Sequence, residues 1–238
     1  MANRHYYLII DTETTQDGKV ADFGALVCDR KGRIYHETGI LVRGIYDDKE
    51  NHPLFYHGDA DPLWGRSTLP KRYARYDSMI DNGQRLLASV PAINRWLGKV
   101  IGKYNPTLTA YNLAFDLDKL NNTGIDVSGC SARFCLWHAA AHKWARTKAY
   151  RKFILETGEF NNRTALGNWS YRTKAETMAR YLLGADLPDE PHTALEDARD
   201  YEMPILQALA QRVPRNKMIN PPPFTWRDVQ VTDAFKPV

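Results

Sequence analysis

The sequence predicts an α/β domain with a mixed sheet flanked by helices, because strand-like runs precede and alternate with helical patterns. Five strands are expected, at about residues 5–11, 20–28, 33–42, 107–111 and 131–137. The first three are rich in β-branched and aromatic residues. A turn at residues 29–32 joins the second and third and favours a hairpin.

Helices are expected between and after these strands. The clearest pattern runs from Arg85 to Gly98, where apolar residues recur at helical spacing. These residues are Leu86, Leu87, Val90, Ile93, Trp96 and Leu97. Further helices are expected at about 137–150, 173–183 and 193–212.

Length and composition favour one compact domain. The chain has 238 residues, of which 43% are hydrophobic, enough to form a sizeable core. We expect the domain to cover residues 1–212, with insertions at about 44–83 and 142–174. Residues 213–238 contain three consecutive prolines and are expected to form an extended tail.

The apolar runs and the cysteines indicate the expected compartment. No run approaches the ~18 apolar residues of a membrane-spanning helix. No basic and then apolar leader is expected at the start of the sequence. The three cysteines follow no disulfide pattern, which suits a reducing environment. We therefore expect a cytoplasmic protein without a membrane partner.

The first strand ends in two acidic residues, Asp11 and Glu13. Residues two apart on a strand point to the same side, so both carboxylates can face one point. Two anions held this close repel each other unless a cation lies between them. Oxygen ligands without a neighbouring cysteine favour Mg²⁺ or Mn²⁺ over zinc. Two solvated acids at a strand end are the alternative for this pair taken alone.

A second group, one histidine and one aspartate, lies near the end of the expected domain. His192 precedes a helical segment, and Asp197 follows about one and a half turns later. A histidine in a loop at a helix start can exchange a proton with water near neutral pH. Asp116 adds a further acid after the fourth strand.

These three groups resemble the motifs of the DEDDh family of 3′→5′ exonucleases, the DnaQ-like group of the ribonuclease H-like superfold. The resemblance covers about residues 5–210 and rests on the segments 11–14, 111–116 and 192–198. It implies a ribonuclease H-like sheet. It also implies that Asp11, Glu13, Asp116 and Asp197 hold two Mg²⁺ or Mn²⁺ ions, with His192 as general base.

The same resemblance implies a substrate and its contacts. The substrate would be the 3′ end of single-stranded or frayed DNA, cleaved to nucleoside 5′-monophosphates by two-metal hydrolysis. Thr12 and Thr14 would contact the terminal nucleotide, and Asn112 would bind substrate or fix its loop. Cations and aromatics alternate at residues 71–76 and 143–152, which suits contact with unpaired nucleic acid. A solvated basic helix face is the simpler reading of these two runs.

Other functions are compatible with the same residues. The five site residues serve RNA as well as DNA, so a 3′→5′ exoribonuclease is an alternative. A catalytically inactive relative that binds nucleic acid is another. A proofreading subunit with a polymerase or replication partner is a third, in which the proline-containing tail would dock that partner.

Several other side chains are candidates for a zinc site or for additional acids of the active site. Cys130, Cys135, His138 and His142 have a spacing conceivable for zinc, although a strand at Cys135 would break their common face. We expect Asp118 and Asp200 to point away from the site. Asp189, Glu190 and Glu196 are expected to be helix-entry and surface acids.

Overall fold

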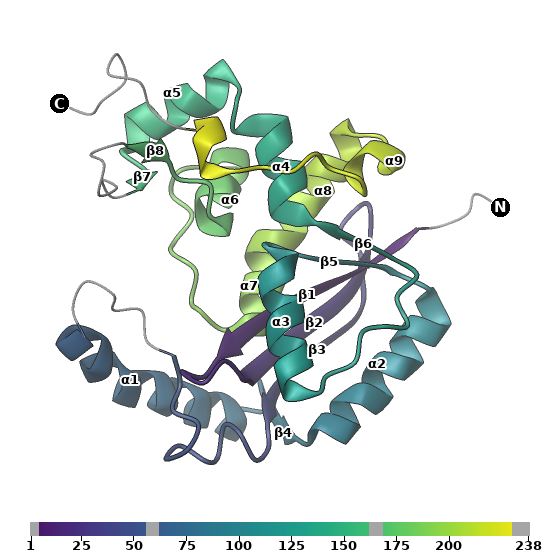
Figure 1. Cartoon of the computed structure of the whole chain (residues 1–238), viewed down its shortest axis with the longest axis vertical. Coiled ribbons are helices and arrows are strands. Elements are labelled where there is room, and N and C mark those ends of the chain that lie inside the picture. Colours follow the sequence, from purple (N-terminus) through teal and green to yellow (C-terminus); the bar gives the residue numbers. More distant parts are fainter. Residues whose placement is uncertain (1–4, 56–61, 162–168, 230–238) are drawn as a thin grey trace.

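A six-stranded mixed sheet forms the centre of the molecule (Figure 1). The computed structural model describes residues 5–55, 62–161 and 169–229. The strands are β1 Tyr6–Thr14, β2 Val20–Asp29, β3 Ile34–Val42, β4 Leu86–Ala88, β5 Thr107–Ala110 and β6 Ala132–Cys135. Their order is β4-β3-β2-β1-β5-β6. The first three are antiparallel neighbours, whereas β4, β5 and β6 each pair in parallel.

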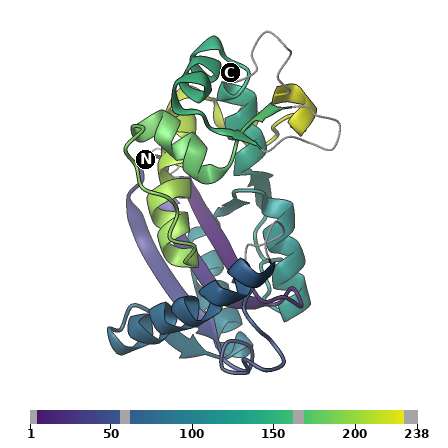
Figure 2. The ribbon, with the colours of Figure 1, turned by 90° about the vertical axis from the view of Figure 1, so that its left-hand side faces the viewer.

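Helices cover both faces of this sheet. They are α1 Pro62–Asp81, α2 Val90–Tyr104, α3 Leu113–Thr123, α4 Leu136–Trp144, α5 Lys148–Thr157, α6 Ala175–Leu183, α7 Ala194–Asp197, η1 Ala198–Glu202, α8 Met203–Arg212, α9 Arg215–Met218 and η2 Trp226–Val229. A separate short ribbon joins β7 Phe160–Asn161 to β8 Ser170–Tyr171. Figures 1 and 2 show α1 at one end of the molecule and α4 to α6 at the other.

The alternation of side chains along β1 divides the core into two parts. Tyr7 and Ile9 pack with α4, α6 and α8 on one face. Leu8 and Ile10 pack with α2 and α3 on the other. Successive strand residues point to opposite faces, so Asp11 and Glu13 follow Tyr7 and Ile9 toward the α7 and α8 side.

The predicted α/β class with a mixed sheet flanked by helices is confirmed, and two helix boundaries are corrected. The helix expected from Arg85 begins only at Val90. Leu86 and Leu87 lie on β4, which is the sixth strand where five were expected. The helix expected at 137–150 is two helices, because α5 restarts at the capping residue Thr147, whose hydroxyl accepts the Tyr150 N–H.

The helix expected at 193–212 contains a π-turn over residues 198–202. The Met203 N–H donates to the Ala198 carbonyl, five residues back. Pro204 follows at the start of α8 and has no N–H to continue an α-helical ladder. In the turn before the proline, the backbone hydrogen bond therefore spans five residues instead of four.

Segments predicted as insertions and tail are only partly described. Residues 56–61, 162–168 and 230–238 lie outside the described residues. Within the predicted tail, Met218 and Phe224 are buried in the core beside α4 and α8. The domain boundaries stay a prediction. In the described part of the chain, no helix has the length and apolar character to cross a membrane.

A glycine lets the third motif approach the sheet. Gly24 on β2 pairs with Asp11 in the β1–β2 register. A Cβ atom at position 24 would lie 2.2 Å from the backbone carbonyl carbon of Ala194. No side chain fits there, because real Cβ atoms do not come that close to backbone. The first turn of α7 can therefore lie directly over the strand pair that carries Asp11.

A buried ion-pair network fixes the same region. Arg85 has no exposed side-chain surface, and its Nε lies 2.9 Å from Asp22 Oδ1 on β2. Its Nη1 donates to Glu196 Oε1 of α7 at 3.1 Å. Asp22 Oδ2 also accepts the Ala194 N–H at 3.0 Å. Glu196 is thus not simply the surface acid that the sequence predicted.

Removing the Arg85 charge should destabilise the protein strongly. Arg85→Met would leave the Asp22 carboxylate buried without its cation, and we expect the free energy of unfolding to fall by about 3–5 kcal/mol. Urea denaturation measures this value. Arg199→Met is the control, because Arg199 pairs with exposed Asp200 and such pairs contribute about 0–1 kcal/mol. Equal losses in both variants would contradict the structural role of Arg85.

Candidate active site

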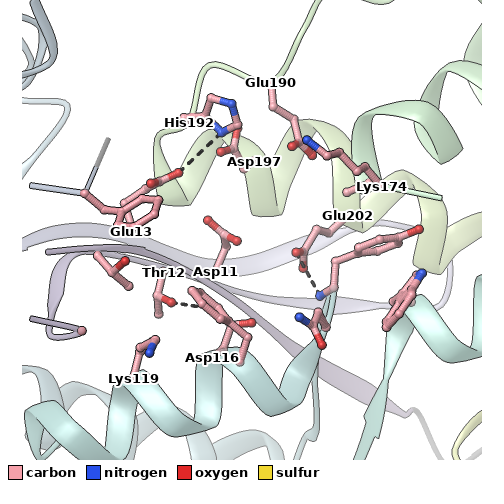
Figure 3. Close-up of a pocket in the computed structure, with 18 of the residues that line it drawn as sticks. Asp11, Thr12, Glu13, Asp116, Lys119, Lys174, Glu190, His192, Asp197 and Glu202 are labelled. Carbon is pink, nitrogen blue, oxygen red and sulfur yellow. Dashed lines mark hydrogen bonds and ion pairs between the residues drawn. The ribbon is translucent and has the colours of Figure 1, made fainter. Parts of the chain in front are cut away.

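A cavity of about 750 Å³ opens where β1 ends, and all five predicted catalytic residues line it. Figure 3 shows their side chains converging from three separate parts of the chain. Asp11 and Glu13 come from β1, and Asp116 comes from the first turn of α3. His192 and Asp197 come from the loop before α7 and from α7 itself.

Three of these residues have the geometry of a metal site. Glu13, His192 and Asp197 each offer one ligand atom, and these atoms lie within 4.8 Å of one another. His192 Nδ1 is 3.8 Å from Glu13 Oε1. Among the described residues, no comparable group includes Cys130, Cys135, His138 or His142. Cys135 ends β6, and the two histidines follow on α4.

Thr12 holds Asp116 in place. Its hydroxyl donates a hydrogen bond of 2.8 Å to Asp116 Oδ1, and both residues are buried. Thr12, Thr14 and Asn112 all line the cavity, as substrate contact would require. Asn112 has a left-handed backbone with φ of 73° at the N-terminus of α3, which turns the chain sharply from β5 into that helix.

Helix α1 supports the loop that carries His192. His192 has φ of 53°, a conformation that non-glycine residues adopt at a cost of about 1–3 kcal/mol. Its carbonyl accepts hydrogen bonds from the Tyr76 hydroxyl at 3.3 Å and from Arg72 Nη2 at 3.4 Å. Arg75 Nη1 donates to the Pro191 carbonyl. These three donors offset the strain and hold the histidine at the cavity.

Arg72 also neutralises part of the acidic cluster. Its Nη2 lies 2.8 Å from Glu13 Oε2, and both side chains are largely buried. The predicted basic and aromatic run at 71–76 therefore contributes to the site through Arg72, Arg75 and Tyr76. The run at 143–152 does not line the cavity. Among the described residues, the cations that do line it are Lys119 and Lys174.

Burial raises the pKa values of three carboxylates at this site. Desolvation, followed by the charges of Glu190 and Glu13, raises the pKa of Asp197 to about 9. Desolvation likewise raises the pKa of Asp116 to about 7, although the Thr12 hydrogen bond lowers it. The pKa of Asp11 is also raised, by burial and then by the charge of Glu202. A bound divalent cation would reverse these shifts.

Two acids that the sequence did not assign to the site also line the cavity. Glu190 was expected to be a helix-entry acid, yet it lines the cavity, and burial raises its pKa to about 7. Glu202 also lines the cavity, although in an unbroken α-helix it would lie about 140° away from Asp197. Pro204, two residues after Glu202, is the feature of the sequence that signals the altered turn. Asp118 and Asp200 are exposed and pair with neighbouring cations, as expected.

The residues present fit a divalent cation. Asp197 Oδ1 and Glu202 Oε2 are buried and have no hydrogen-bond partner. A buried anionic oxygen without a partner is costly, and a cation removes that cost. Carboxylate oxygens with a single imidazole suit Mg²⁺ or Mn²⁺. Glu13, His192 and Asp197 are therefore able to hold a divalent cation, whereas Asp11 and Asp116 as further ligands stay a prediction.

Comparisons with known proteins give a limited result. No protein-family model matches this chain, and a search of curated proteins finds no match. Among solved structures, the chain is similar to exonuclease I in complex with the inhibitor BCBP, at 11% sequence identity and a TM-score of 0.45. The match covers 92% of this chain and 43% of that chain. This chain thus corresponds to less than half of that exonuclease.

Loss of the Thr12 hydroxyl should weaken cation binding. Thr12→Val keeps the shape of the side chain but removes the hydrogen bond that orients Asp116. We expect the affinity for Mn²⁺, measured by calorimetric titration, to fall about 10–100-fold, as for other residues that orient metal ligands. Thr14→Val is the matched control, because Thr14 is also buried on β1 but makes no hydrogen bond to Asp116. Equal affinities in both variants would contradict this role of Thr12.

Without metal, the protein should lose stability as pH rises. The raised pKa values of Asp116 and Asp197, about 7 and about 9, mean that the folded state binds more protons than the unfolded chain. The free energy of unfolding therefore falls from about pH 4, the pKa of an unfolded aspartate, up to about pH 9. In EDTA we expect a lower thermal midpoint at pH 8.5 than at pH 5.5, and a weaker dependence in Asp197→Asn. An unchanged slope in that variant would contradict the assignment.

Proposed function

We propose that this protein is a metal-dependent 3′→5′ exonuclease of the DEDDh type. One observation supports this above others: four carboxylates and one histidine, distant in sequence, line a single cavity with buried oxygens that lack partners. Their order and spacing are those that the sequence motifs indicate. The proposed substrate is the 3′ end of single-stranded or frayed DNA, with RNA as the alternative.

The chain's own residues would perform the positioning and the proton transfer. Asp11, Glu13, Asp116 and Asp197 would hold two Mg²⁺ or Mn²⁺ ions. When bound, such ions stabilise charge on the phosphate and lower the pKa of water. His192 is about half exposed at the cavity, where its ring can accept the proton of the attacking water. The Glu13 carboxylate lies 3.8 Å from Nδ1, where it can orient that ring.

The remainder of the cavity suits a nucleotide. Its volume of about 750 Å³ lies within the range of small-ligand sites, about 300–1,000 Å³. The rings of Tyr111, Phe115 and Trp137 line it and could stack against bases. Lys119 and Lys174 could neutralise phosphates. Aromatic rings of this kind stack the bases of single strands, so an unpaired 3′ end is favoured.

Hydrolysis of labelled oligonucleotides tests the proposal. With 5′-labelled single-stranded DNA and Mg²⁺ or Mn²⁺, we expect a ladder that shortens from the 3′ end and is abolished by EDTA. Asp11→Asn should remove the activity. His192→Ala should lower kcat about 10²–10⁴-fold, because general base catalysis contributes about that much. An RNA substrate of the same sequence decides between the two polymers.

Asp200→Asn is the control for this assay, because Asp200 lies three residues after Asp197 but is exposed and pairs with Arg199. It should retain the wild-type rate. Intact oligonucleotides with every metal, together with retained binding to DNA or RNA, would instead support a catalytically inactive binding protein. Cleavage that persists in Asp11→Asn would place the active site elsewhere.

A further inference from the structure

The π-turn of η1 changes which side chains face the cavity. In an α-helix, a residue five positions after Asp197 would be rotated by about 140° from it. The i→i−5 hydrogen bond from Met203 to Ala198 widens the turn and reduces this rotation. Glu202 thereby comes onto the same side of the helix as Asp197. Figure 3 shows its carboxylate pointing into the space that the Asp11 carboxylate also faces.

Glu202 has two carboxylate oxygens with different environments. Oε1 accepts the backbone N–H of Tyr111 at 3.0 Å, at the end of β5. Oε2 is buried and has no hydrogen-bond partner. The whole residue is only 2% exposed, and it lines the cavity. One oxygen is therefore fixed by the backbone, and the other remains available for a ligand.

The surroundings of Glu202 are acidic. Among the charged groups near Asp11, Glu202 has the largest effect on the Asp11 pKa. Asp116 has the largest such effect on Glu202 itself. An additional buried carboxylate beside these acids is unfavourable unless a cation shares it. Acceptance of the Tyr111 N–H alone would not require a charged group, since a glutamine carbonyl could accept it.

We propose that Glu202 is a fifth carboxylate of the metal centre, and that its Oε2 binds the divalent cation held by Asp11, directly or through a coordinated water. This inference rests on the proposed metal site. The π-turn then has a role, because it places a second acid of the α7–η1 segment at the cavity beside β1. Glu202 would also contribute a ligand to the cation near Asp11 from the helical side of the cavity.

Direct measurement of metal binding tests this role apart from activity. Mn²⁺ binding to the purified full chain would be followed by electron paramagnetic resonance for the wild type and for Glu202→Gln. Glutamine keeps a carbonyl oxygen for the Tyr111 N–H but lacks the charge. We expect the affinity of one bound ion to fall about 10–100-fold. Asp200→Asn is the control, because Asp200 lies on the same π-turn but is exposed, and it should bind like the wild type.

Thermal unfolding separates a binding role from a structural one. Without metal, Glu202→Gln should unfold at a higher temperature than the wild type, because it removes one buried charge from the acidic cluster. With saturating Mn²⁺ it should gain less stability than the wild type. Wild-type affinity in Glu202→Gln would overturn the inference and leave Glu202 as a backbone acceptor. Absence of Mn²⁺ binding by the wild type would instead overturn the proposed function together with this inference.

Discussion

Mutual repulsion between buried carboxylates is the constraint on which the rest of this structure depends. The cavity holds acids from β1, α3 and the α7–η1 segment, and desolvation together with the charges of neighbouring carboxylates raises the pKa values of Asp11, Asp116 and Asp197. Such a cluster is unfavourable in the folded protein unless other groups neutralise it or a cation binds. The elements around the cavity supply the neutralising groups, and the buried oxygens without hydrogen-bond partners are suited to binding a cation.

Much of the surrounding architecture serves to hold these acids together. Arg85 connects β2 with α7 beneath the cavity through Asp22 and Glu196. Arg72 reaches Glu13 from α1, and the same helix supports the His192 loop. Two arginines thus neutralise acids at the margins of the cluster, whereas no ion pair between described residues neutralises Asp11, Asp116 or Asp197. That distribution of charge favours a cation at the centre.

The parts of the site that the sequence predicts are those with regular spacing. Asp11 and Glu13 share a face because strand residues alternate, and Asp197 follows His192 at a helical interval. Glu202 could not be predicted in this way, because the π-turn before Pro204 changes the interval. Leu86 and Leu87 matched a helical pattern, yet pairing with β3 places them on a strand. The contacts of α1 with His192 depend on long-range packing that no local pattern encodes.

The close approach of α7 to Gly24 has a consequence for biosynthesis. Asp11 is synthesised well before the segment that lies over its strand pair, which carries His192 and Asp197. A nascent chain that has reached only α6 has the β1 acids but lacks the histidine and the last aspartate. The complete cavity therefore forms only after the segment through Asp197 has left the ribosome, so shorter nascent chains cannot assemble it.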